Sequence, residues 1–431
     1  MEQERPVERP DERPDEPGGV SRRRAVALIG LGTAACVAAA GAALAGAGGD
    51  DPPPATAAAA TPSEPPDAGA VEAVLANRAA AVREHDRVRF LATVASAPAA
   101  YQEAQAAVYD NLARLPLGSW RERFEAIEPA TASGAPAVRV SLRYRLHGFD
   151  RGEVARTRYL TFARRSGTWV IVGDAAARGL RDDVEMWDGG PLTVRRGRGG
   201  LVIGDARGLD EIARRLDAAV PVVTGVVGTG WARRAVVLVP SDPAQASALA
   251  GDDRELKEIA ALAAVAPAAG GGRGEDRVIV SPGTFGRLND LGKSVVLTHE
   301  VTHVATGGAQ DGRTPVWLIE GFADYVGYRK AKVSVRSAAR ELRREVTGGR
   351  TPARLPAADA FSGTAPRLSQ AYQEAWLACR MIADRYGEPA LVRLYRAAAR
   401  GGEEAALREV LGVTPPRFTA MWRDYLHEEL R

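Results

Sequence analysis

The feature that most restricts the fold is the sequence HEVTH at residues 299–303. Valines before, within and after it fall on one face of a helix. Residues four apart project from the same side of a helix, so His299 and His303 can both bind one metal ion. Glu300 lies one residue round from His299, where it can contact a water on that ion without binding the ion itself. Two imidazoles leave a zinc site short of a third protein ligand.

A second segment downstream can supply that ligand. It reads WLIEGFADY at residues 317–325 and begins just after Pro315, a good residue for a helix start. Glu320 follows His303 by 17 positions, and the glycine-rich stretch between them leaves room for a turn and an antiparallel return. Asp324 lies four residues after Glu320, on the same helical face, where it can accept the free N–H of a ligand histidine. We therefore expect His299, His303 and Glu320 to bind one Zn²⁺ per chain, with Asp324 orienting a ligand.

These two segments at this distance resemble the gluzincin metallopeptidases, specifically the peptidase MA-like group related to the M1 aminopeptidases. The similarity covers about residues 195–431. It implies the same three zinc ligands, Glu300 as general base and Asp324 as the orienting carboxylate. A further match, AYQEAWLA at residues 371–378, implies that Tyr372 donates a hydrogen bond to the tetrahedral intermediate. An ordinary core or surface tyrosine is the alternative for Tyr372.

The chain also departs from the M1 enzymes. No G-x-M-E-N run precedes the metal helix, and in those enzymes that run supplies the acidic residue that captures a free amino terminus. An endopeptidase or another amide hydrolase is therefore as well supported as an aminopeptidase. Residues 277–281 are expected to form the edge strand of the cleft, which would pair with an extended peptide.

The N-terminal region predicts export. Residues 1–20 are rich in Glu, Asp, Arg and Pro, so a disordered tail is expected there. Residues 25–48 are apolar, with three arginines before them and two aspartates after them, which predicts a single-pass cell-membrane protein with a cytoplasmic N-terminus and an extracellular catalytic domain. A cleaved signal, giving a secreted protein, and a buried helix of a soluble protein are the alternatives.

The rest of the chain reads as an α+β protein. After a Pro/Ala-rich linker, the first part is helical and then β-stranded, and it closes with GTWVIVG at residues 167–173, which resembles the NTF2-like (SnoaL-like) fold. An unnamed α+β module is the alternative. From about residue 190, strands and helices alternate before a mainly helical C-terminal half, as expected for a gluzincin domain. The predicted boundaries are a cytoplasmic tail at 1–20, a transmembrane or signal segment at 21–48, a linker at 49–69, an NTF2-like domain at 70–178 and a peptidase domain at 190–431.

The predicted function is a zinc-dependent metallopeptidase that cleaves peptide bonds outside the cytoplasmic membrane, by metal-activated water with Glu300 as the base. Its expected partners are a peptide or protein substrate and, through the N-terminal segment, the membrane. A net charge of +3 gives no case for nucleic-acid binding. One alternative is a membrane-tethered binding protein that uses the NTF2-like pocket and carries a degenerate peptidase scaffold. Another is a cell-envelope protein whose zinc only joins helices.

Overall fold

The computed structural model describes residues 66–128, 137–251, 259–307 and 312–431. The predicted tail, the apolar segment at 21–48 and most of the linker lie outside these residues. Within them, no helix is long and apolar enough to cross a bilayer. The longest, α12 (Glu388–Leu411), carries charged side chains along its length. This finding contradicts the predicted single-pass membrane location.

The N-terminal unit, taken here as the described part of residues 66–188, has its helices first and a four-stranded antiparallel sheet after them, in the order β1-β2-β3-β4. The second and third helices are separate, and Pro98, just before the third, has an extended backbone with ψ of 145°. The elements are α1 (Ala68–Arg83), α2 (Arg87–Ala92), α3 (Ala99–Leu112), β1 (Leu117–Glu128), β2 (Ala137–Leu146), β3 (Val154–Arg165), β4 (Thr168–Asp174), η1 (Ala176–Arg178) and η2 (Met186–Asp188).

The C-terminal unit, the described part of residues 193–431, is built on a five-stranded sheet in the order β5-β6-β7-β9-β8. Strands β6, β7 and β9 are parallel, and the outer strands β5 and β8 run antiparallel to their neighbours. The strands are β5 (Thr193–Arg196), β6 (Gly200–Gly204), β7 (Ala235–Val239), β8 (Ala261–Ala266) and β9 (Glu275–Val280). The prediction of an edge strand at residues 277–281 is therefore wrong. That segment falls in β9, between β7 and β8, and β8 forms the edge.

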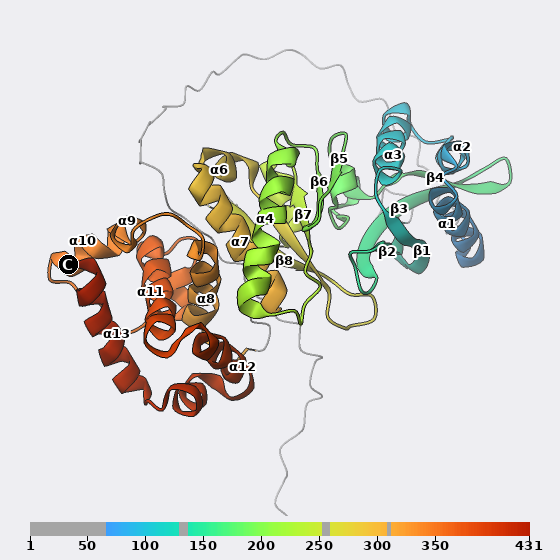
Figure 1. Ribbon diagram of the computed structural model, residues 1–431. Coiled ribbons are helices and arrows are strands. Elements are labelled where there is room, and N and C mark those ends of the chain that lie inside the picture. Colours follow the sequence, from blue (N-terminus) through green and yellow to red (C-terminus); the bar gives the residue numbers. More distant parts are fainter. Residues whose placement is uncertain (1–65, 129–136, 252–258, 308–311) are drawn as a thin grey trace, which may run out of the picture.

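Helices form the rest of the unit, and all but α5, which packs on the opposite face, lie on one side of this sheet (Figure 1). They are α4 (Leu209–Val227), α5 (Pro243–Leu249), α6 (Pro282–Arg287), α7 (Asp290–Thr306), α8 (Val316–Tyr328), α9 (Val335–Ala338), α10 (Arg340–Thr347), η3 (Ala358–Phe361), α11 (Leu368–Tyr386), α12 and α13 (Pro415–Leu430). Both ends of α7 are capped: the Asn289 side chain accepts a hydrogen bond from the N–H of Gly292 at 2.8 Å, and Gly307 ends the helix with φ of 83°. The predicted mixed α+β architecture is confirmed.

The two faces of the five-stranded sheet bury different partners. On one face, Val237 and Val278 belong to the core shared with the helices of the C-terminal unit. On the other, Leu238 and Ile279 belong to a core that also contains Trp120 of the N-terminal unit. Because side chains alternate between the faces of a strand, neighbouring residues reach opposite cores. The N-terminal unit thus packs directly on the sheet that precedes α7, the helix that carries residues 299–303 (Figure 1).

Candidate metal centre

Three predicted ligands converge between α7 and α8. His299 and His303 lie on α7, and Glu320 lies on α8. The two histidine Nε2 atoms are 2.9 Å apart, and Glu320 Oε2 lies 3.3 Å from Nε2 of His299 and 3.4 Å from that of His303. Zinc bonds of about 2.0–2.2 Å in a tetrahedron set neighbouring ligand atoms about 3.3–3.6 Å apart. This buried group could hold a metal ion.

The unpaired state of Glu320 supports a cation between these side chains. Its Oε2 atom is buried and has no hydrogen-bond partner in the described part of the chain. Burial by itself would raise the pKa of Glu320, but the two histidines lower it to about 2. Burial would likewise lower the pKa of His299, but the neighbouring carboxylates of Asp324 and Glu320 raise it to about 10. A buried carboxylate without a hydrogen bond is costly, and a bound divalent cation removes that cost.

Asp324 contacts the far side of a ligand ring. Its Oδ1 lies 2.8 Å from His299 Nδ1, and both side chains are buried. Burial raises the pKa of Asp324, whereas the hydrogen bond to His299 lowers it. When Asp324 accepts the Nδ1–H, the lone pair of Nε2 is left free to bind the ion. The position matches the role expected for this residue.

Glu300 lies beside the three ligand side chains but is not itself one of the ligands. Its Oε2 accepts a hydrogen bond from the N–H of Ala263, in edge strand β8, at 2.8 Å. Its Oε1 is buried and has no partner among the described residues. Burial raises the pKa of Glu300 to about 7 despite the nearby histidines. A carboxyl group with a near-neutral pKa and one free oxygen is suited to accept and release a proton.

Tyr372, on α11, is the last of the predicted site residues, and it lies beside the ligands. Its ring centroid lies 6.2 Å from that of His299, and Phe361 packs edge-on against it at 5.3 Å. The hydroxyl is buried and no described residue bonds to it. Burial, followed by the charge of Glu320, raises the pKa of Tyr372 well above its usual range, so the hydroxyl stays protonated and able to donate. The predicted residue thus lies at the centre, with its one polar atom free.

Two contacts of the centre were not predicted from the sequence. One is the Ala263 N–H that holds Glu300, because β8 is a short alanine-rich strand without alternation. The other is Gly321: a Cβ there would lie 2.2 Å from the carbonyl oxygen of Ala375, so α8 and α11 touch backbone to backbone. The glycine after Glu320 was part of the motif, but the sequence alone did not show which helix it faces.

Comparison with known proteins adds no assignment. No protein-family model matches the chain, and no curated protein is similar to it. The functional interpretation therefore depends on the geometry of the centre and on the resemblance carried by its two helices.

Proposed function

We propose that the chain is a zinc-dependent metallopeptidase of the gluzincin type. The observation that carries this proposal is the pair of free oxygens beside the three ligands. Glu300 Oε1 and Tyr372 Oη are both buried without a partner among the described residues. A metal that only joined helices would have no use for either group, and burying them unpaired costs about 1–3 kcal/mol each. Substrate and water would satisfy both.

The fold assignments belong to the same proposal. We assign residues 190–431 to a gluzincin-like domain, because the metal helix α7 follows a sheet and pairs with α8 in the order that the resemblance implies. We assign residues 70–178 to an NTF2-like domain, because three helices precede a four-stranded antiparallel sheet. The ligand set of two histidines and a glutamate is typical of catalytic zinc, which keeps one position open.

The reaction is hydrolysis of a peptide bond. When bound, zinc supplies Lewis-acid chemistry that polarises the carbonyl and acidifies a water. Glu300 takes a proton from the attacking water through its free oxygen and passes it to the leaving nitrogen. The water oxygen stays on the acyl carbon as the C–N bond breaks. The Tyr372 hydroxyl donates a hydrogen bond to the oxyanion of the tetrahedral intermediate.

The decisive experiment uses the full-length chain loaded with zinc and a mixed peptide library, with and without a chelator. We expect cleavage that the chelator abolishes. The variant Glu300→Gln should keep one zinc per chain and lose about 10²–10⁴-fold in turnover, the usual contribution of a general base. Glu404→Gln, the same change at an exposed ion pair with Arg408, serves as the control.

Two results would contradict the proposal. A zinc-loaded parent chain that cleaves no peptide would favour a binding protein on a peptidase scaffold. Turnover by Glu300→Gln equal to that of the parent would show that this carboxylate is not the base.

A further inference from the structure

The loop between β2 and β3 of the N-terminal unit is joined to strand β9 by a buried ion pair. Two guanidinium nitrogens of Arg277 donate to the two carboxylate oxygens of Asp150, at 2.8 and 2.9 Å. Arg277 is only 4% exposed and Asp150 only 9% exposed. A buried pair of this kind adds little net stability over apolar side chains of the same size, but its two parallel bonds fix orientation. The pair therefore fixes the orientation of the β2–β3 loop against β9, and this connection between the two units is the joint.

Further hydrogen bonds extend the joint to the start of β9 and to the turn between β8 and β9. Glu275 Oε1 accepts hydrogen bonds from the N–H groups of Arg151 and Gly152, at 3.0 and 2.8 Å. Beyond it, the N–H of Ala155 donates to the carbonyl of Pro267, and the N–H of Ala269 donates to the carbonyl of Glu153, both at 2.9 Å. The start of β3 is thus paired with the β8–β9 hairpin, as the bridge between Val154 and Ala268 also shows.

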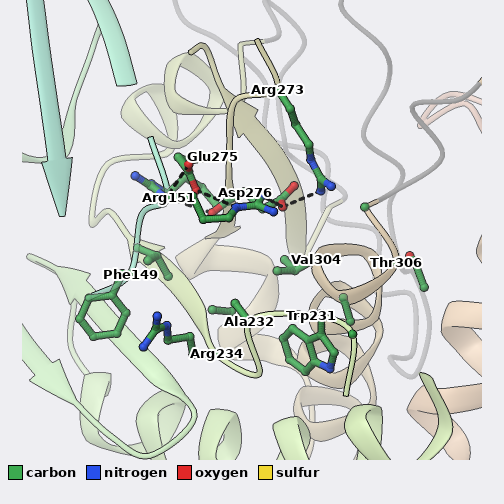
Figure 2. A pocket seen from close by; sticks show the side chains of 16 residues that line it. Phe149, Arg151, Trp231, Ala232, Arg234, Arg273, Glu275, Asp276, Val304 and Thr306 are labelled. Atoms are coloured by element: carbon green, nitrogen blue, oxygen red, sulfur yellow. Dashed lines mark hydrogen bonds and ion pairs between the residues drawn. The ribbon is translucent and has the colours of Figure 1, made fainter. Parts of the chain in front are cut away.

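On its other side the hairpin adjoins open space. A cavity of about 240 Å³ lies between it, Phe149 of the N-terminal unit and the last turn of α7. Figure 2 shows Arg151, Glu275 and Asp276 along one wall of this cavity, with Val304 of α7 beside it. No described side chain fills this space, so packing on that side does not hold the turn of the hairpin. The hydrogen bonds and the ion pair of the joint do.

We propose that the N-terminal unit positions the general base of the metal centre through this hairpin. Residues 150–153 hold β9 and the β8–β9 turn, and β8 holds Glu300 through the Ala263 N–H. Asp150, Glu275 and Arg277 are positioning residues, since none of them touches the metal ligands. The inference rests on the proposed peptidase function.

Strand β8 supplies a hydrogen bond that orients the Glu300 side chain, which projects from α7. As the edge strand, β8 pairs only with β9 in the sheet, with Leu262 opposite Ile279. Movement of β9 or the turn is therefore passed to Ala263, whose N–H makes the one hydrogen bond to the Glu300 side chain among the described residues. Displacing a reacting group by about 1 Å can cost about 10²-fold in rate. The metal ligands, on α7 and α8, receive no bond from the hairpin in the described residues.

The test compares Asp150→Asn with the full-length parent, both loaded with zinc. We expect equal zinc content, a kcat lower by about 10-fold or more and a KM within about 3-fold, since the base is displaced and the ion is not. Amide hydrogen exchange at residues 261–269 should accelerate about 10-fold, while exchange in α7 and α8 stays unchanged. Asp110→Asn is the matched control, because Asp110 forms an exposed ion pair with Arg87 in the same unit.

A second variant tests the inference if Asp150→Asn does not fold. Glu275→Ala removes the acceptor of the Arg151 and Gly152 N–H groups and should give the same pattern. Faster exchange at the hairpin with an unchanged kcat would overturn the inference, as would unchanged exchange or an acceleration spread over the whole chain. A parent chain without peptidase activity would overturn the proposed function alone, because exchange at the Ala263 amide reports the link to Glu300 by itself.

Discussion

A buried polar network of the N-terminal unit and the candidate metal centre of the C-terminal unit differ in how their polar atoms are paired. In the N-terminal unit, buried Arg78 donates to Thr93 Oγ1 at 3.0 Å and lies 3.5 Å from Glu122, whose carboxylate also accepts the Trp120 N–H at 3.0 Å. The Tyr144 hydroxyl donates to another buried carboxylate at 3.0 Å. None of these polar atoms lacks a partner. This network is a closed structural core.

At the metal centre the balance is reversed. Glu300, Glu320 and Tyr372 each keep one buried oxygen without a hydrogen bond in the described chain. Native proteins rarely leave such atoms unpaired, because each one costs stability. The network around Glu122 is fully paired, whereas three buried oxygens without a hydrogen-bond partner among the described residues lie together at this one centre.

The largest effect on stability is expected in the Arg78–Glu122 network of the N-terminal unit, whose buried polar atoms are all paired. Arg78→Met removes the cation beside Glu122 and leaves that buried carboxylate with the Trp120 N–H alone. We expect a loss of about 3–5 kcal/mol in the free energy of unfolding, measured by urea denaturation. Zinc bound per folded chain should not change. A loss below about 1 kcal/mol would show that this network does not stabilise the unit.

Two tyrosines test the contrast directly. Tyr372→Phe removes an unpaired hydroxyl, so we expect kcat to fall about 10²–10³-fold, with unfolding free energy within about 1 kcal/mol of the parent. Tyr144→Phe removes a paired hydroxyl, so it should cost about 1.5–3 kcal/mol of stability and leave kcat unchanged. Steady-state kinetics and denaturation of both variants distinguish a catalytic role from a structural role for each hydroxyl. If both lost only stability, Tyr372 would be an ordinary core residue.

Glu374, on α11, lies between the paired and the unpaired cases: it is buried, and Arg367 is its cationic partner among the described residues. Burial raises its pKa from 4.5 to about 7, although Arg367 lies 2.8 Å away. Between these pH values the folded chain keeps a proton that the unfolded chain has released, so this group makes stability fall as pH rises. Across that window the fall is about 3 kcal/mol, and Glu374→Gln should lack it. Unfolding curves of parent and variant at pH 5 and pH 8 measure the difference, and parallel pH dependences would contradict the prediction.

The sequence was most informative where regular helical geometry links residues. A spacing of four puts His299 and His303 on one side of α7, and the helix after Pro315 carries Glu320 and Asp324 on one face. The group of three side chains that could hold a metal ion follows from these spacings. The assigned roles of Glu300 and Tyr372 remain predictions that the kinetic tests address.

The remaining features depend on contacts between distant residues. Ala263 meets Glu300 across 37 positions, and Asp150 meets Arg277 across 127. Contacts of this range leave no periodic pattern in a sequence, so neither was predicted. The mistaken edge strand at residues 277–281 has the same cause. Strand β8 is recognisable only through its pairing with β9, since its six residues do not alternate between polar and apolar.

The backbone contact at Gly321 has a consequence for biosynthesis. Helix α8 contacts α11 at the carbonyl of Ala375, and α11 also carries Tyr372. A nascent chain that has left the ribosome only as far as α10 holds both histidines and the glutamate but lacks Tyr372 and its wall. Under the proposed function, the complete catalytic group therefore forms only after α11 has been synthesised.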